Sequence, residues 1–325
     1  MQAIQDDMTS VASDSEDASW PIENVVDDHQ INLWRAVAND QSAELTVVLP
    51  NMSPYANAVF IGNTNAVSGT VTVYDSTGTG TPLVASQSMN FITSGMFTFF
   101  TQKRLETFAA AWVDWTNQTQ EVVLKITLQT SKISDITITA GGAGYTAGKL
   151  TAAGAGSGFY GTYTVDSDGA IDSVHISDGG VHWSGGETLT PSDPGAAGSG
   201  AAFIAYSTVN CGVIRAGFAK NFSNPNMGFA EGFEDYSIYK DFHSGAEYVK
   251  RRKMVRTFSG DLWVKLTELN DLNNVSRQSR ITPLAWNLLG TENRGLMFGK
   301  LTAMPSSKRT HMEYMTTSLK FKEVL

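Results

Sequence analysis

The sequence predicts a mainly β protein, in which an N-terminal β-sandwich is interrupted by a small inserted β-repeat lobe and followed by a small β or α+β C-terminal domain. Three observations predict this class. Of 325 residues, 17% are charged and 42% hydrophobic, with abundant Thr, Ser, Gly and Ala, a mix that suits short strands better than surface helices. Alternating or apolar runs recur between turn residues. An internal repeat marks an insertion, and the length suits two or three domains.

The first 19 residues are acidic, Ser-rich and poor in large apolar groups. We expect a flexible arm at residues 1–19, because so few apolar side chains do not offset the ordering entropy.

Residues 1–28 hold eight Asp/Glu and no Lys or Arg, whereas residues 250–325 hold fourteen Lys/Arg against six Asp/Glu. One interpretation is that opposite charges join neighbouring copies in a homo-oligomer, and the alternative is two solvated surfaces. The assembly candidates are Asp14, Glu16, Asp17, Lys250, Arg251, Arg252, Lys253 and Arg256.

Short strands separated by turns predict the sandwich in residues 20–130 plus 208–237. The clearest runs are SAELTVVLP (42–50), ANAVFIGNTNA (56–66) and GTVTVYD (69–75), with another strand at Glu121–Leu128. We expect Val209–Phe218 to close this sandwich by pairing with the strand at 121–128.

The intervening residues 131–207 contain the internal repeat. Residues 133–151 align with 171–190, which pairs Tyr145 with Trp183, and each copy is followed by a run of small residues, AGAGSG or GAAGSGA. Such a repeat predicts two copies of one unit that bury their apolar faces on each other. The insertion is expected to project as a separate lobe.

The C-terminal domain is predicted over 238–325. Alternating strands flank one short helix, which the spacing of Leu266, Leu269, Leu272 and Val275 predicts.

Catalytic and metal-binding patterns are weak. The five histidines are scattered, and DSDGAID (166–172) suits a hairpin turn better than a calcium site, so no metal or other cofactor is expected. Cys211 lies in an apolar run with no His nearby. The best carboxylate cluster for a glycosidase is Glu231, Glu234 and Asp235. We therefore expect no enzyme, with a polysaccharide depolymerase as an alternative.

Nucleic acid and membrane are not expected partners. Residues of the basic run at 250–253 alternate faces in a strand, and the chain as a whole is acidic with a net charge of −9. No window approaches the roughly 20 apolar residues of a membrane span.

Sugar binding remains an option, because lectin-like sites combine an aromatic face with a few polar groups. Aromatic side chains in such domains are more often core, but Tyr145 and Trp183 recur beside glycine turns in a lobe with little core to hide them. The candidates for glycan contact are Trp34, Arg35, Trp112, Trp115, Asn117, Tyr145, His182 and Trp183.

Several of these motifs resemble known proteins. WPIENVVDDHQINLWRA with AELTVVLP and NAVFIGNTNA is similar to galactose-binding, discoidin-like jelly rolls, in particular to a version in tail proteins of tailed bacteriophages. In that version the last sandwich strand reads Ile-Gly-Arg-x-x-x-Gly, followed by an Asn-x-x-x-Gly turn and Asp-x-Ser. The repeat resembles a module of phage tail fibres and adhesins. Residues at matching places are Arg215, Gly217, Asn226, Gly228, Asp235 and Ser237.

The resemblance implies a structural virion protein of the tail tip, baseplate or fibre-attachment region, assembled in the host cytoplasm with other tail proteins. Its inserted lobe would face outward toward host-surface polysaccharide. A receptor-binding, lectin-like adhesin is the alternative.

Overall fold

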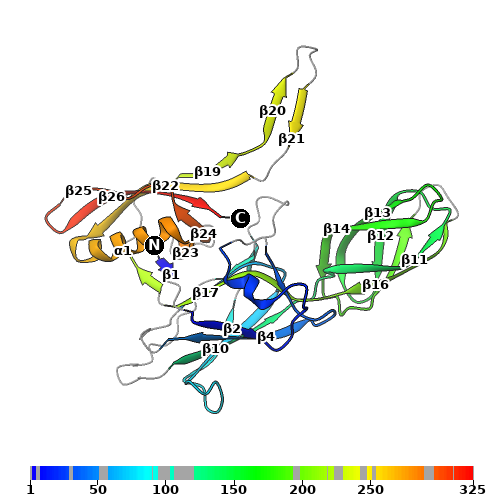
Figure 1. Ribbon diagram of the computed structural model, residues 1–325, viewed down its shortest axis with the longest axis horizontal. Coiled ribbons are helices and arrows are strands. Elements are labelled where there is room, and N and C mark those ends of the chain that lie inside the picture. The colour runs from blue at the N-terminus through cyan, green and yellow to red at the C-terminus, as the bar shows by residue number, and fades with distance from the viewer. Residues whose placement is uncertain are drawn as a thin grey trace.

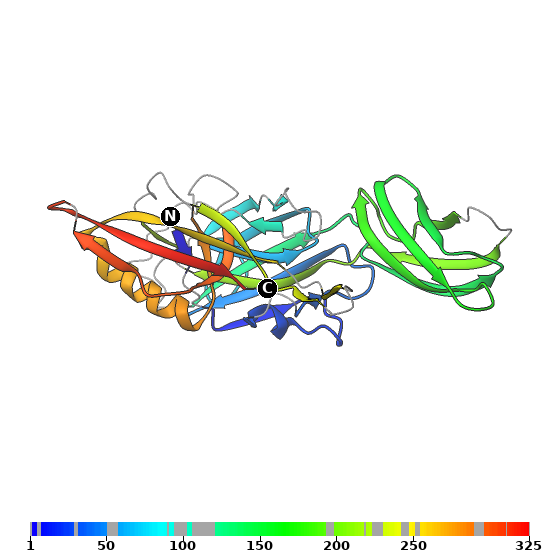
Figure 2. The same cartoon turned by 90° about the horizontal axis from the view of Figure 1, so that it is seen from above.

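The computed structural model describes residues 2–4, 8–28, 32–50, 58–89, 91–93, 103–105, 121–192, 198–217, 219–222, 230–241, 247–250, 254–288, 296–309 and 311–324. The chain is mainly β, as its composition predicts, and its strands form antiparallel sheets. Seen from above, the inserted lobe lies at one end of the long axis and the C-terminal sheet at the other (Figure 2).

The central sandwich consists of two facing sheets around one core. One sheet has the order β2-β4-β10-β6-β7 and the other β3-β17-β5. Alternate residues point inward, as in β4, where Ala43, Leu45, Val47 and Leu49 are buried. The bounds of the sandwich strands are Ser10–Ser13 (β2), Trp34–Arg35 (β3), Ser42–Leu49 (β4), Ala58–Thr64 (β5), Ser68–Tyr74 (β6), Val84–Met89 (β7), Val122–Gln129 (β10) and Asn210–Gly217 (β17).

The expected pairing of the strand at 209–218 with the strand at 121–128 is wrong. Strand β17 pairs with β3 and β5, whereas β10 pairs with β4 and β6. Side chains of both sheets nevertheless share one core, because β17 lies in the opposite layer of the sandwich. Apolar alternation predicts a strand, but it does not identify the neighbours of that strand.

The flexible arm expected at residues 1–19 is also wrong. Strand β1 (Gln2–Ile4) lies between β18 (Ala219–Asn221) and β23 (Leu284–Asn287), and β2 pairs with β4. Ala3 and Ile4 are buried there. A few well-placed apolar residues thus order the described parts of a segment whose average composition is typical of disorder.

The C-terminal domain is an eight-stranded sheet covered on one face by a helix. Helix α1 (Leu269–Ile281) buries Leu272 and Val275 against the sheet, as their spacing predicts. Because β18 and β19 (Ala230–Asp235) belong to this sheet, the sandwich ends at Gly217 and not near Ser237. The other strands are β22 (Met254–Lys265), β24 (Leu296–Leu301), β25 (Ser306–Arg309) and β26 (Tyr314–Glu323).

Smaller elements complete the description. Strands β20 (Ile238–Asp241) and β21 (Glu247–Lys250) form a ribbon that projects from the end of β19 and β22 (Figure 1). Strands β8 (Phe91–Thr93) and β9 (Lys103–Leu105) pair with each other. Two short 3-10 helices are η1 (Ile22–Val26) and η2 (Leu266–Glu268).

The lobe consists of two three-strand repeats that exchange partners. The first strand of each repeat pairs with the last strand of the other, β11 with β16 and β14 with β13, while β12 and β15 pair across the middle. Thr151 and Thr190, which occupy the same place in the two repeats, face each other there. The bounds are Asp135–Ala143 (β11), Gly148–Ala153 (β12), Ser157–Val165 (β13), Ile171–Val181 (β14), Thr188–Ser192 (β15) and Ser199–Tyr206 (β16).

Candidate interaction surfaces

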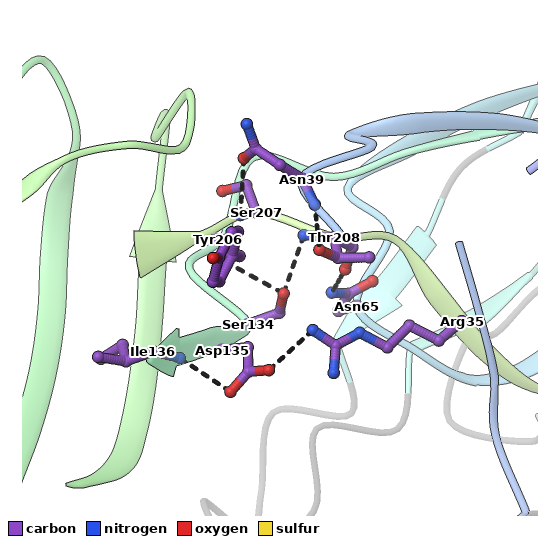
Figure 3. Close-up of polar contacts among 9 residues, drawn as sticks. All are labelled: Arg35, Asn39, Asn65, Ser134, Asp135, Ile136, Tyr206, Ser207 and Thr208. Carbon is purple, nitrogen blue, oxygen red and sulfur yellow. Dashed lines mark hydrogen bonds and ion pairs between the residues drawn. The ribbon is translucent and has the colours of Figure 1, made fainter. Parts of the chain in front are cut away.

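The lobe is connected to the sandwich by two adjacent chain segments, residues 130–134 and 207–209. The backbone N–H of Thr208 donates to Ser134 Oγ at 2.9 Å, and the N–H of Ser134 donates to the Tyr206 carbonyl at 2.8 Å (Figure 3). Ser207 and Thr208 are fully buried. Since buried polar groups are costly unless they are hydrogen-bonded, this connection favours one geometry over a flexible hinge.

Two asparagines of the sandwich hold the same connection from the other side. The N–H of Asn39 donates to Thr208 Oγ1 at 2.9 Å, and Asn65 Nδ2 donates to the Thr208 carbonyl at 2.7 Å. Asn65 Oδ1 accepts from the N–H of Asn210 at 3.0 Å, so its amide group bonds the backbone on both sides of Val209. Figure 3 shows the bond from Asn65 to Thr208. We call these residues, Asn39, Asn65, Ser134, Ser207 and Thr208, the lobe mount.

Further contacts surround the lobe mount. Arg35 Nη2 lies 2.9 Å from Asp135 Oδ2, in a partly exposed ion pair. Gln41 Nε2 donates to the Trp183 carbonyl at 3.2 Å. Exposed ion pairs contribute little, about 0–1 kcal/mol, so the buried hydrogen bonds of the mount dominate the rigidity of this junction.

The lobe's two repeat aromatics are core residues, so their prediction as glycan contacts is wrong. Tyr145 is 9% exposed and Trp183 3% exposed. A Cβ added at Gly198 would lie 2.3 Å from the Tyr145 ring, and one added at Gly156 would lie 2.1 Å from the Trp183 ring. Each ring therefore packs over a glycine of the other repeat, at a position where a larger side chain would not fit.

The remaining glycan candidates that the structure describes do not converge. Trp34 is buried in the sandwich core, and Arg35 is engaged with Asp135. His182 is exposed on a loop next to the lobe mount, where its backbone has a left-handed φ of 63°. Trp112, Trp115 and Asn117 lie outside the described residues.

The carboxylates Glu231, Glu234 and Asp235 are engaged in separate contacts. Glu231 pairs with Arg256 at 3.0 Å and Glu234 with Lys322 at 2.9 Å, while Asp235 Oδ1 accepts from the Ser237 N–H at 2.8 Å. Glu231 and Asp235 share one face of β19 but lie ~13 Å apart along the strand, beyond the about 5–9.5 Å of a glycosidase pair. Glu234 points to the opposite face. The geometry gives no support to the depolymerase interpretation.

The DSDGAID segment forms a turn. Asp166 Oδ1 accepts from the N–H groups of Asp168 and Ala170, each at 2.9 Å. Within the described ranges, no group of three His, Cys, Asp or Glu side chains is placed to hold a metal ion.

The charged assembly candidates lie on different domains. Asp14, Glu16 and Asp17 lie beside β2, where Asp14 Oδ1 accepts from the Glu44 N–H at 2.8 Å. Lys250 is exposed at the end of β21, and Arg256 is paired with Glu231. Arg251, Arg252 and Lys253 lie outside the part of the chain that the structure describes.

Composition alone did not indicate that Arg215 joins two domains. Its side chain is 1% exposed and donates to the carbonyls of Val25 and Asp27, at 3.3 and 3.1 Å. Its guanidinium lies 5.0 Å from the ring centroid of Phe298 in β24. The signal in the sequence is a charged residue inside the apolar strand VIRAG, where an unpaired charge would be costly.

Comparisons with family models, curated proteins and solved structures found no match. Among the described residues, no helix is long and apolar enough to cross a membrane.

Proposed function

We propose that this chain is a structural virion protein of a tailed bacteriophage, located in the tail tip, baseplate or fibre-attachment region. It works as a homo-oligomer together with other tail proteins. The observation that carries the proposal is the lobe mount, which holds a β lobe with its own core at a fixed position on the sandwich. Because the lobe is fixed at one end of an elongated molecule, a chain that is bound in an assembly by its other domains would hold the lobe surface in a defined direction.

Two further observations support the proposal. The resemblance to phage tail proteins extends over the sandwich and the C-terminal domain, including Arg215 and Gly217 at the place where β17 meets the C-terminal domain. The interface between these domains contains Phe60, Val213 and Phe298, all buried. Large, apolar contacts between domains favour one arrangement of the molecule.

The experiment is immunoelectron microscopy. Antibodies against the recombinant chain are applied to particles from the lysate in which the chain is produced, and we expect label on the tail. Label that is absent from purified particles but present in the soluble fraction would overturn the proposal. Competition with the isolated antigen is the matched control for specificity.

Host contact through the lobe belongs to the same proposal. The lobe lies away from the C-terminal domain, at the end of the long axis (Figure 2), which favours an outward position. Adsorption of the purified chain to host cells tests this part, with His182→Ala as the variant at the exposed ring among the described candidates. No adsorption of the intact chain would remove the adhesin alternative and leave the structural role.

A further inference from the structure

Among the residues that the structure describes, no helix covers the second face of the C-terminal sheet. Inward residues of β22 and β26, such as Leu262 and Phe321, are buried in the core beneath α1. The alternate residues point the other way, because side chains alternate faces along a strand. Figure 1 shows this second face of β22, β25 and β26 turned away from both α1 and the sandwich.

An exposed aromatic cluster lies on this open face. Trp263 is 48% exposed, and its ring centroid lies 6.3 Å from that of Tyr314 on β26. The N–H of Leu266 donates to the Glu313 carbonyl at 3.0 Å, which brings the exposed Leu266 beside the same strand end. Clustered exposed apolar side chains of this kind mark interaction sites.

Lysines surround the cluster. Lys265 is opposite Tyr314, Lys308 is opposite Thr316, and Thr316 is opposite Trp263. Cross-strand neighbours of this kind have Cβ atoms about 5 Å apart. Lys308 therefore lies roughly 10 Å from Trp263, on the far side of Thr316, and Lys265 follows Trp263 by two residues on the same face of β22. Lys320 extends the row along β26. Within the described residues, no ion pair involves Lys265, Lys308 or Lys320. We call Trp263, Lys265, Lys308, Tyr314 and Lys320 the basic-aromatic face.

The sandwich carries a surface of opposite charge. Glu16 and Glu23 are exposed on either side of Trp20, which is 40% exposed. The exposed Val37 lies beside Glu16, because its N–H donates to the Oγ of the preceding Ser15 at 3.0 Å, and the N–H of Arg35 donates to the Trp20 carbonyl at 3.2 Å. This surface combines apolar side chains with acidic groups, whereas the open face of the C-terminal sheet combines them with three lysines and with the acidic side chain of Asp261. We call Asp14, Glu16, Trp20, Glu23 and Val37 the acidic edge.

We propose that the basic-aromatic face of one copy docks on the acidic edge of a second copy of this chain. The inference rests on the proposed function, which requires a homo-oligomer, and it names the contact. Complementary charge selects the partner and the register, while the aromatic side chains supply the buried area. The net charge of −9 opposes contact with a second copy as much as with a polyanion, so it does not select the partner. The exposed Trp20 and Val37 do, because they let the acidic edge match the basic-aromatic face in apolar area as well as in charge.

The two surfaces belong to different domains, so the contact is heterologous. Each copy would offer one surface to each neighbour, and repetition of such a contact gives a ring, or a filament where the rotation does not close.

Sedimentation velocity of the full chain at low and high salt tests the proposal. We expect salt-sensitive self-association. Lys265→Glu with Lys308→Glu, and separately Glu16→Lys with Glu23→Lys, should each weaken association by roughly tenfold or more. Mixing the two variants should restore it, because each then meets a partner of opposite charge. Lys149→Glu with Arg277→Glu changes the net charge as the first pair does, but on the lobe and on α1, and should leave association intact.

Three results would overturn the proposal: a chain that stays monomeric at every concentration, association that neither reversal changes, or no restoration on mixing. Binding of heparin or an oligonucleotide that Lys265→Glu with Lys308→Glu abolishes, with self-association unchanged, would assign the face to a polyanion instead. Circular dichroism confirms that each variant is folded. Tail labelling in virions is scored separately, so a failed interface does not decide the virion location.

Discussion

Arg215 is a positive charge within the interior of the molecule. The residue belongs to β17 of the sandwich, its hydrogen bonds reach Val25 in η1 and Asp27 just after it, and its cation–π contact reaches β24 of the C-terminal sheet. The Asp28 carboxylate lies 3.3 Å from Nη2. A buried charge is tolerated only where its partners are in place, so this one side chain depends on the correct arrangement of three segments.

Substitution of Arg215 by Ala should therefore be strongly destabilising. Loss of the side chain leaves a cavity and the unpaired carbonyls of Val25 and Asp27, which together should cost about 3–5 kcal/mol. A lower urea midpoint in unfolding followed by tryptophan fluorescence would measure this cost. Arg35→Ala is the matched control, because the Arg35–Asp135 pair is partly exposed and should cost about 1 kcal/mol or less. Equal, small losses for both variants would contradict the role assigned to Arg215.

The buried thiol of Cys211 makes the free energy of unfolding decrease with pH at alkaline pH. Burial raises the pKa of the Cys211 thiol from an ordinary value of 9.0 to about 12. The folded state thus holds the thiol proton more tightly than the unfolded state does. This contribution is fully present below pH 9 and is lost as the pH rises from there toward 12.

We expect wild-type unfolding free energy to fall more steeply with pH than that of Cys211→Ala. Between about pH 9 and 12 the difference should approach 1.4 kcal/mol per pH unit. Chemical denaturation of both proteins at pH 8 to 11 measures it, and parallel curves would show that the thiol does not contribute.

At the scale of elements, the sequence predicts strands better than their partners. Alternation identified the β4 and β10 strands, and the spacing of Leu272 and Val275 identified α1. The pairing of β17 was missed, because an apolar strand suits either layer of a sandwich. The three residues of β1 were missed because so short a strand leaves no periodic pattern.

The repeat shows the same limit within the lobe. Aligning Tyr145 with Trp183 correctly indicated equivalent positions, but an alignment cannot show that the two halves exchange strands. Only the exchange places each ring over the glycine of the other repeat. The supposed surface aromatics are consequently the centre of the lobe core.

The exchanged packing makes a prediction at two equivalent sites. Gly156→Ala and Gly198→Ala should each cost about 1–3 kcal/mol, typical of overpacking in a core, since the new methyl group would overlap the Trp183 or Tyr145 ring. Ala155→Ser, at an exposed neighbouring position, is the control. Thermal melts of the three variants compare them, and a strong effect at only one glycine would contradict the equivalence of the repeats.

The whole molecule is held together by contacts that cross domain boundaries. Strand β1 takes the start of the chain into the C-terminal sheet, Arg215 fixes that sheet to the sandwich, and the lobe mount fixes the lobe. We therefore expect the sandwich, the lobe and the C-terminal domain to move as one rigid body. A contact between copies on the C-terminal sheet can set the position of the lobe in an assembly only if the three parts are rigidly connected.

Rigidity of the lobe mount is directly measurable. Cysteines introduced at His175 in the lobe and Ser86 in the sandwich, both exposed, accept spin labels, while the buried Cys211 thiol resists labelling because burial disfavours its thiolate. Double electron–electron resonance should give one narrow distance distribution. Asn65→Ala removes the side-chain bonds to the Thr208 carbonyl and the Asn210 N–H, and Asn39→Ala removes the contact of Oδ1 with the Ser207 N–H at 3.5 Å, while the backbone bond of residue 39 stays. Each side-chain bond is worth about 0.5–1.5 kcal/mol, so the double variant should broaden that distribution. Asn270→Ala with Asn274→Ala, exposed on α1, should leave it narrow. A broad distribution in the unmodified mount would mean that the lobe swings freely, and it would remove the observation on which the proposed function depends.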